Sequence, residues 1–517
     1  MSILSDEQYR IAEAIVEISY CNPFARRRVE LEKQALGDQF RDYGPFFHLP
    51  TSMLQHQTFR NTVGDIAETL LASMRENLVQ ERDVSEADVA LYRDLSNFLL
   101  YHRHLSEVTT EAGNDADHLA KIESVWKDFL HDYQQMMVLP GLDIPALYTA
   151  HHLFALQSQV VRAFARIFRH IFGASRPAAQ LRTAVWESIF THDMRRYAQS
   201  LYQRMGELPT LITGPSGTGK ELVAQAIGQA RYIPFDTKTG RFESNLEQDF
   251  HAINISAFSS TLVESELFGH SKGSFTGAVS DRKGWLEICS QYGCVFLDEI
   301  GELSTSTQVI LLRVLQERQF QRIGDTHQRR FEGKIISATN RDLVREMEAG
   351  RFRADFYYRL CADVVVTPSL RQQLDDNPSD LQNLARHFVI QLVGNNEDLI
   401  QTTTEEVTTY IEQHIPDTYP WQGNMRELEQ CVRNIVIRGS YQPIPDTSTP
   451  VDGDFRAELA NQVVNGTLTL DELQARYCSL VVADTGSYRA AAARLASDRR
   501  TVQRRAQRAF IERFSAD

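Results

Sequence analysis

The chain has 517 residues, of which 42% are hydrophobic, and it carries a formal net charge of −14 at pH 7. This composition excludes a wholly disordered chain, and the length predicts about three domains. The six cysteines lack Cys-x-x-Cys spacing and no apolar run is long enough to cross a bilayer, which excludes a disulfide framework, a zinc ribbon and a membrane span. Because the N-terminus also lacks a basic and apolar leader, we expect a cytoplasmic protein with no membrane partner.

Residues 1–180 are predicted to form an α-helical regulatory domain. Apolar residues recur there at three- and four-residue spacing, which is typical of amphipathic helices. The clearest segments are residues 61–81, 87–107, 117–137 and 147–172. Strands do not alternate with helices and no acidic cluster accompanies them, which disfavours a phosphorylated receiver domain. We expect a sensor for a small molecule or a partner protein, with an effector that the sequence does not identify.

Histidines are concentrated in this first region, where nine of the fifteen precede residue 171. They include His102, His104, His151 and His152, which raises the hypothesis of a metal or haem site. Adjacent histidines on a helix point in different directions, however, and no Cys or Glu stands at ligand spacing. The pattern favours ordinary surface or core histidines.

A glycine-rich loop follows a predicted buried strand at residues 208–213 and precedes a predicted helix at residues 221–229. Its glycines leave the backbone free to wrap phosphates with its amides, and Lys220 adds a charge on the outer phosphates. The loop consists of Gly214, Pro215, Ser216, Gly217, Thr218, Gly219 and Lys220. Glu221 stands where the strict phosphate-loop pattern has Ser or Thr.

Two acidic residues follow a second apolar strand, Val295-Phe296-Leu297. The carboxylate of Asp298 lies at the strand's end, where it can hold Mg²⁺, and Glu299 beside it can polarise a water molecule. Together with the loop around Lys220, this pair predicts a site that binds ATP with Mg²⁺ and hydrolyses it.

Several further motifs accompany these two. The motifs are Gly217-Thr218-Gly219-Lys220-Glu221-Leu222, Glu264-Ser265-Glu266-Leu267-Phe268-Gly269-His270, residues 273–278, Phe296-Leu297-Asp298-Glu299, Ala338-Thr339-Asn340-Arg341-Asp342-Leu343 and Gly423-Asn424-Met425-Arg426-Glu427-Leu428. Over residues 186–440 the chain closely resembles the bacterial enhancer-binding proteins, which are AAA+ activators of sigma-54 RNA polymerase. This family commonly carries Glu after the lysine, as at Glu221. The resemblance implies an α/β ATPase subdomain over residues 186–370 and a helical lid over residues 371–440.

The resemblance also assigns roles around the nucleotide. Asn340 would sense the terminal phosphate, and Arg426 on the lid would close over the bound nucleotide. Asn254 would hold Glu299 away from water until the nucleotide state changes.

Two arginines would act between subunits. The resemblance implies that Arg353 and Arg359 reach the neighbouring subunit's site, where a guanidinium stabilises charge on the transferred phosphoryl group. Such a role requires a ring, which we expect to be a homo-hexamer, although heptamers occur in such systems. The alternative for each arginine is an ordinary surface ion pair.

The loop at residues 273–278 distinguishes this family from other AAA+ proteins. In the family its Phe and Thr protrude into the pore of the ring and contact sigma-54, which here implies Phe275 and Thr276. The full loop is Gly273, Ser274, Phe275, Thr276, Gly277 and Ala278. Ser274 replaces the usual alanine. The alternative is a glycine-rich turn with one isolated aromatic residue.

Residues 232–249 are longer and more polar than the usual connection after the phosphate-loop helix. Lys238-Thr239-Gly240-Arg241 predicts an exposed turn, so the preferred interpretation is a surface insertion.

The C-terminal part predicts a tethered DNA-binding unit. Residues 441–465 begin with a stretch rich in Pro, Ser, Thr and Asp, which predicts a linker. Residues 489–508 hold seven arginines and one acidic residue, which favours a polyanionic partner. Residues 466–517 resemble a Fis-type helix-turn-helix, although Ala496 and Ser497 replace its corner glycine and next apolar residue. The implied DNA-contacting residues are Arg499, Arg500, Thr501, Gln503, Arg504 and Arg505. The alternative is a basic, solvated helix.

These predictions describe a multidomain protein with an α-helical N-terminal domain, an α/β AAA+ ATPase with helical lid and a small all-α helix-turn-helix domain. The predicted function is sigma-54-dependent activation of transcription, with sigma-54 RNA polymerase and enhancer DNA as partners. One alternative is an AAA+ enzyme that remodels another protein. The other is a DNA-binding regulator whose nucleotide serves assembly only, against which the intact Lys220, Asp298, Glu299 and Arg353 argue.

Overall fold

The computed structural model describes residues 4–41, 51–80, 85–105, 116–140, 143–443, 459–460, 462–485 and 487–513. The chain divides into two compact units, Met1–Tyr441 and Gln442–Asp517. Among the described residues, no helix is both long enough and apolar enough to cross a membrane. Most of the predicted linker, residues 444–458, lies outside the described residues.

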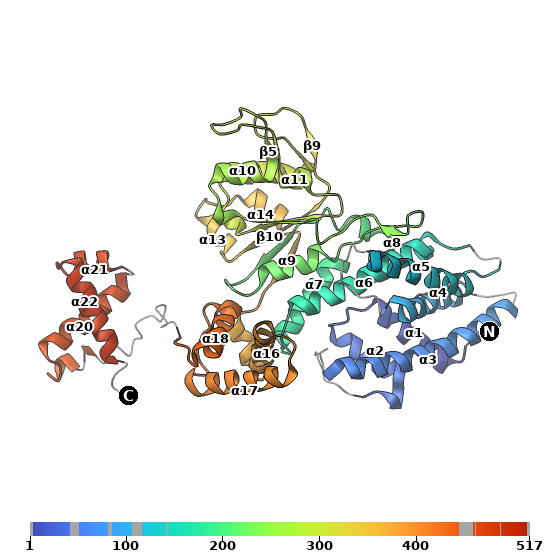
Figure 1. Ribbon diagram of the computed structural model, residues 1–517, viewed down its shortest axis with the longest axis horizontal. Coiled ribbons are helices and arrows are strands. Elements are labelled where there is room, and N and C mark those ends of the chain that lie inside the picture. The colour runs from blue at the N-terminus through green and yellow to red at the C-terminus, as the bar shows by residue number, and fades with distance from the viewer. Residues whose placement is uncertain are drawn as a thin grey trace. The chain divides into compact units, whose positions relative to one another are not determined.

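The N-terminal region is helical, as predicted (Figure 1). Its helices are α1 (Asp6–Tyr20), α2 (Arg26–Leu36), α3 (Thr51–Gln80), α4 (Glu86–Leu100), α5 (Ala116–Met137), α6 (Ala150–His170) and α7 (Arg176–Phe190). Serine side chains cap three of them, because the hydroxyls of Ser5, Ser85 and Ser175 accept hydrogen bonds from free backbone N–H groups of the first turn. A π-helical turn, Tyr101–Leu105, extends α4.

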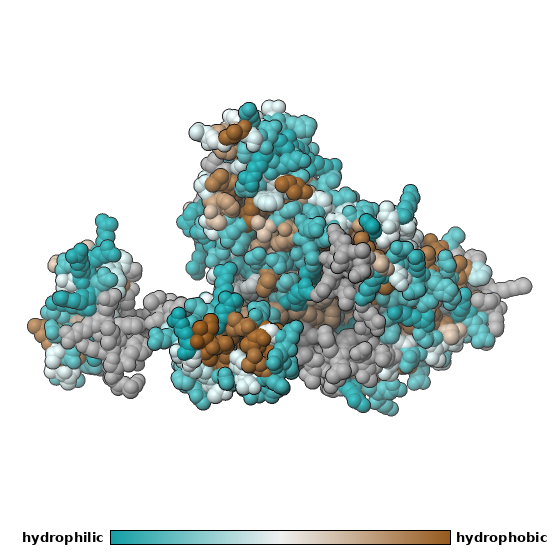
Figure 2. Space-filling view, in the orientation of Figure 1, coloured by the Kyte–Doolittle hydropathy of each residue, from teal (hydrophilic) through white to brown (hydrophobic). Residues whose placement is uncertain are grey.

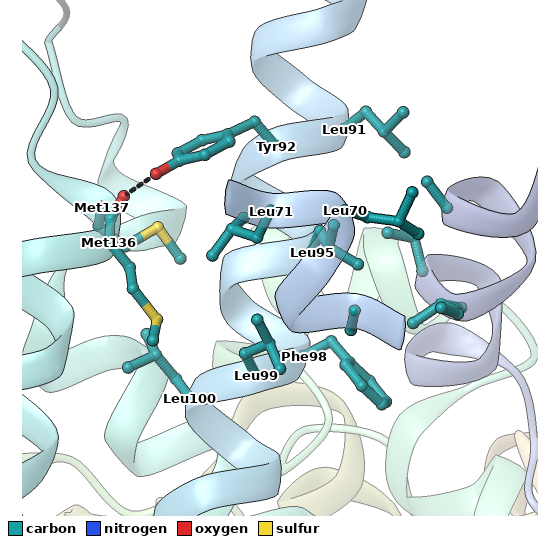
Figure 3. Close-up of a cluster of buried hydrophobic side chains, with 14 of the residues drawn as sticks. Leu70, Leu71, Leu91, Tyr92, Leu95, Phe98, Leu99, Leu100, Met136 and Met137 are labelled. Carbon is teal, nitrogen blue, oxygen red and sulfur yellow. Dashed lines mark hydrogen bonds between the residues drawn. The ribbon is translucent and has the colours of Figure 1, made fainter. Parts of the chain in front are cut away.

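Helices α1, α3 and α5 pack around α4, whose apolar side chains fill the space between them (Figure 3). Leu95 and Leu99 have no exposed surface. Tyr92 is equally buried, and its hydroxyl donates to the backbone carbonyl of Met136 on α5 at 2.8 Å. The buried polar group therefore has a partner, and the region has a core of its own.

The central domain is built on a parallel sheet with the strand order β11-β1-β10-β7-β4. Its strands are β1 (Thr210–Thr213), β4 (Phe250–Asn254), β7 (Cys294–Asp298), β10 (Lys334–Thr339) and β11 (Asp363–Val366). Neighbouring residues of β1 face opposite sides: Leu211 belongs to the core shared with α10, α12 and α14, and Ile212 to the core shared with α7 and α9. Both faces are covered, which is the arrangement expected for a parallel sheet.

The helices of the central domain lie on these two faces. They are α8 (Met194–Gln199), α9 (Lys220–Gly228), α10 (Ser260–Phe268), α11 (Trp285–Ile288), α12 (Thr305–Glu317), α13 (Leu343–Glu348) and α14 (Ala354–Leu360). Short antiparallel pairs join β5 (Gly269–His270) to β6 (Arg282–Lys283) and β8 (Gln319–Phe320) to β9 (Arg329–Arg330). The lid that follows consists of α15 (Leu370–Asp376), α16 (Asp380–Val393), α17 (Glu397–His414) and α18 (Asn424–Arg438).

Residues 232–249 are not only a surface insertion, as was predicted, because part of the segment is buried against the N-terminal helices. They form the hairpin β2 (Phe235–Asp236) and β3 (Arg241–Phe242), whose turn is exposed as predicted. Phe235 is only 3% exposed, because its ring packs 4.8 Å from Trp126 on α5 and 4.7 Å from Phe154 on α6. Arg166 on α6 forms an ion pair with Glu247. The hairpin therefore joins the ATPase domain to the helical region.

The C-terminal unit contains three helices, α20 (Leu470–Thr485), α21 (Tyr488–Arg494) and α22 (Arg499–Arg513). Its small core includes Cys478, Ala491 and Val502, one from each helix. The corner between α21 and α22 keeps a left-handed residue although alanine stands there, since Ala496 has a φ of 46°.

We predict that Phe235→Ala lowers the free energy of unfolding of the helical region by about 3 kcal/mol or more, because a buried aromatic ring is removed from a packed cluster. Denaturant unfolding followed by tryptophan fluorescence measures this, since Trp126 contacts the ring. Lys238→Ala at the exposed turn is the control. Equal free energies of unfolding for the two variants would contradict the packing of the hairpin against α5 and α6.

Candidate active site

The candidate site lies where four neighbouring strands end. Because the strands are parallel, their carboxyl ends share one edge of the sheet. β1 leads into the loop at residues 214–220, β7 ends at Asp298, β10 is followed by Asn340, and β4 ends at Asn254. Asn254 is the register partner of Asp298. The edge therefore brings together the residues predicted to bind nucleotide and to act on it.

The loop at residues 214–220 needs glycine for two reasons. Gly214, Gly217 and Gly219 have φ values of 149°, 78° and 86°, which residues with a Cβ rarely adopt. A Cβ at Gly214 would also clash with Thr367, and one at Gly217 would clash with the backbone of Gly423. The loop is consequently wrapped tightly, with its amides available to an anion at the start of α9.

Lys220 supplies the charge at this loop. Its side chain is 7% exposed, and its Nζ donates to the carbonyl oxygens of Gly214 and Pro215 at 3.0 and 3.1 Å. Burial lowers the pKa of Lys220, while the charges of Glu299 and Asp298 act in the opposite direction. A buried ammonium held over the loop is suited to phosphate oxygens.

The two acidic residues have different environments. Asp298 accepts a hydrogen bond from the backbone N–H of Glu299 at 3.0 Å. Glu299 is held in a left-handed conformation with φ of 56°, which turns its carboxylate toward Asn340, whose N–H donates to it at 3.4 Å. Strained backbone of this kind is concentrated at functional sites.

In this structure Asn254 contacts Asp298 and not Glu299, and its predicted hold on Glu299, which depends on the nucleotide state, stays a prediction. The side-chain amide of Asn254 donates to Asp298 at 3.4 Å, and its oxygen accepts from the N–H of Ser256 at 3.0 Å. The physical reason is the strand register, which places Asn254 beside Asp298, together with the left-handed turn that carries Glu299 away.

The lid contacts the loop through a residue that the sequence analysis did not select. Asn424 is 2% exposed; its amide donates to the carbonyl of Ser216, and its oxygen accepts from the N–H of Leu370, both at 2.8 Å. The N–H of Met425 donates to Gly217 at 3.0 Å. Arg426 follows, exposed beside the loop. The sequence shows Asn424 directly after Gly423, but it does not show the partners of Asn424, Ser216 and Leu370, which lie in distant segments.

Thr367 was also missed. Its hydroxyl lies 2.7 Å from that of Thr218 and 3.2 Å from the carbonyl of Thr213, so it links the end of β11 to the loop. A lone threonine after a strand gives no sequence signal for this contact.

The loop at residues 273–278 lies at the tip of the β5–β6 hairpin, closed by a hydrogen bond from the N–H of Gly273 to the carbonyl of Ala278 at 2.9 Å. Thr276 is exposed. Phe275 is half-buried, and its ring packs edge-on against His270 at 5.0 Å. Its predicted contact with sigma-54 in the pore of a ring stays a prediction. Val279, which the sequence analysis did not select, is 80% exposed beside the loop.

Two family models match the part of the chain that forms this site. The family model described as "Sigma-54 interaction domain" matches residues 187–365, and the one described as "AAA+ ATPase lid domain" matches residues 376–448. The chain carries a sigma-54 interaction domain. Together with the matched AAA+ lid, this places residues 187–448 in the AAA+ ATPase class of domains.

Curated relatives of the sigma-54 interaction domain include the transcriptional regulatory protein ZraR of Escherichia coli K12, which is 39% identical over 252 residues, 47% of this chain and 52% of that protein. The Nif-specific regulatory protein of Azotobacter vinelandii is 41% identical over 227 residues, 44% of this chain and 39% of that protein. The chain thus spans about half or less of the length of these relatives.

Among solved structures, NtrX from Brucella abortus in complex with ATP aligns over 77% of this chain and 87% of that chain, with a TM-score of 0.38 and 19% identity. A TM-score this low adds no support to the assignment, which rests on the two family models.

The two arginines predicted to act between subunits lie at α14. Arg353 precedes α14 and Arg359 lies on it, and both face solvent at least in part. The Arg353 guanidinium pairs with Asp355 at 2.7 Å, and the hydrogen bond that it donates to the Asp355 carboxylate raises the pKa of Arg353.

We predict that Asn424→Ala weakens nucleotide binding by about tenfold, because the lid loses its two hydrogen bonds to the loop and to α15, each worth about 1 kcal/mol. Titration with a fluorescent ATP analogue measures the affinity. Asn434→Ala is the matched control on the same helix, since that amide donates within the helix to Gln430. An unchanged affinity in Asn424→Ala would show that this contact does not position the lid.

Proposed function

We propose that this chain is a sigma-54-dependent transcriptional activator that hydrolyses ATP to remodel the closed sigma-54 RNA polymerase promoter complex. One observation carries the proposal: a single sigma-54 interaction domain holds both the strand-edge site around Lys220 and the exposed loop at residues 273–278. The names of the curated relatives, which are regulatory proteins, support the same function.

ATP would bind with its phosphates in the loop at residues 214–220. The amides of the loop and the Lys220 ammonium would hold the phosphates, Asn340 would sense the terminal phosphate, and Arg426 would close from the lid. Mg²⁺, when bound with the nucleotide, neutralises phosphate charge. The carboxylate of Asp298 is a hard oxygen ligand that remains accessible at the strand's end, so it fits this ion. Glu299 would orient and deprotonate the attacking water.

Assembly into a ring, which we propose to be a homo-hexamer, would complete each site. Arg353 and Arg359 would then act in the neighbouring subunit, after Arg353 exchanges its present partner Asp355 for phosphate. An apolar patch on the lid supports assembly (Figure 2). Val436 and Ile437 on α18 are 38% and 74% exposed, and a neighbouring subunit would cover them.

The C-terminal unit would anchor the ring to enhancer DNA, and residues 1–180 would regulate it. Asp498 caps α22, accepting from the N–H groups of Arg500 and Thr501 at 2.8 and 3.0 Å. Val502 packs inward, so the arginine-rich side of α22 faces solvent. This arrangement supports α22 as the recognition helix, carrying the predicted contacts Arg499, Arg500, Thr501, Gln503, Arg504 and Arg505. Such a protein would work in the cytoplasm, on DNA.

We predict that Glu299→Gln binds ATP with nearly unchanged affinity but hydrolyses it at least about a hundredfold more slowly, because the amide cannot take a proton from water. Phosphate release measures hydrolysis, with Glu317→Gln on the exposed end of α12 as control. If Glu299→Gln hydrolysed normally, Glu299 would not be the base; if it activated transcription without hydrolysis, nucleotide would serve assembly only.

Sigma-54 capture tests the function itself. With ADP and aluminium fluoride, the full chain is expected to form a complex with sigma-54 that survives a native gel, and Thr276→Ala is expected to lose the complex while keeping ATP hydrolysis. Ser280→Ala, outside the loop, should retain both. Hydrolysis without any capture of sigma-54 would refute the proposal and indicate another remodelling target.

A further inference from the structure

An arginine of the ATPase domain is docked into the N-terminal helices. Arg195 lies on α8, inside the sigma-54 interaction domain. Its guanidinium binds Asp94 of α4 at 2.5 Å and Glu17 of α1 at 3.0 Å, and it lies 4.0 Å from the ring centre of Tyr20. Two carboxylates and an aromatic face are the groups that proteins use to bind a guanidinium or ammonium ion.

Asp94 is the centre of this arrangement. It is 4% exposed and accepts from the hydroxyls of Tyr20 at 2.6 Å and Tyr148 at 2.8 Å, besides its ion pair with Arg195. Burial and the charge of Asp94 raise the pKa of both tyrosines, which keeps their hydroxyls as donors. Although burial acts against it, the hydrogen bond to Asp94 raises the pKa of Arg195. The carboxylates of Asp94 and Glu17 and the ring of Tyr20 thus form a binding site for a cation, and the guanidinium of Arg195 occupies it.

A cavity of about 510 Å³ opens beside this cation site, between α1, α2 and α4. This volume lies within the range of small-molecule sites. Leu31 and Leu91 give it an apolar floor, and Figure 3 shows Leu91 beside the packed cluster on α4. Glu13 and Glu17 line it one helical turn apart. Asp94 and Arg195 line it as well, so an occupant would touch both the helical region and the ATPase domain.

We propose that this cavity binds a small organic cation, an amine or guanidinium compound with an apolar body, which competes with Arg195 for Asp94 and Glu17. The exposed carboxylate of Glu13 would attract the cationic group, and the leucines would take the apolar part. The other basic lining residue, Arg27, is turned to Glu30 at 3.4 Å and leaves the carboxylates of α1 to the ligand.

Binding would release α8 from the helical region. The ligand and Arg195 cannot occupy Asp94 together, so binding and this contact between the two regions exclude each other. Binding at this cavity requires neither sigma-54 nor ATP hydrolysis, because the residues that line it belong to α1, α2, α4 and α8.

Isothermal titration of the full chain tests the proposal, with n-pentylguanidinium and n-pentylamine as cationic probes and n-pentanol as the uncharged probe. We expect saturable binding of a cationic probe and none of pentanol. Arg195→Ala should bind the probe about tenfold more tightly, because the internal competitor is gone. Arg27→Ala, which removes a positive charge without removing the competitor, should change the affinity by about twofold or less.

Two further variants test whether loss of binding reflects a lost carboxylate or a misfolded protein. Asp94→Asn and the exposed Glu13→Gln should each weaken binding, and Glu13→Gln leaves the buried contacts untouched. Circular dichroism confirms that each variant is folded. Absence of saturable binding by both cationic probes, equal binding of pentanol, or equal gains in Arg195→Ala and Arg27→Ala would overturn the proposal.

Discussion

The parallel hydrogen bonding of the five-stranded sheet is the constraint on which the site depends. Parallel strands end at the same edge, so a residue placed directly after a strand meets the residues after its neighbours. Asp298, Asn340 and the loop before Lys220 are brought together in this way, although they are far apart in the sequence. The cores on both faces hold the strands in register, and the register decides which side chains meet, as it does for Asn254 and Asp298.

What could be predicted from the sequence was encoded locally. Glycine spacing predicted the loop around Lys220, the end of an apolar strand predicted Asp298, and apolar periodicity predicted the N-terminal helices. The contacts of Asn424 and the burial of Phe235 could not be predicted, because their partners lie in distant segments that only the fold brings near. The packing of the Phe275 ring against His270 was not predicted either, although the two residues belong to the same hairpin, because it depends on how the hairpin folds back.

The helical region is attached to the ATPase domain in two physically different ways. Phe235 inserts an apolar ring between α5 and α6, which favours a lasting attachment because separation would expose the ring to water. Arg195 instead forms charged contacts at the rim of a cavity, where a soluble cation can replace it. Because the Phe235 contact would persist when a ligand displaces Arg195, the ligand could alter the ATPase domain while the two regions stay joined.

The most direct test of the central claim is open-complex formation by sigma-54 RNA polymerase on a supercoiled promoter, measured by permanganate footprinting with the full chain. We expect promoter opening with ATP and none with a non-hydrolysable ATP analogue, even when the analogue saturates the site. Opening with the analogue, or opening in the absence of any nucleotide, would contradict the claim that hydrolysis at this strand edge drives the remodelling.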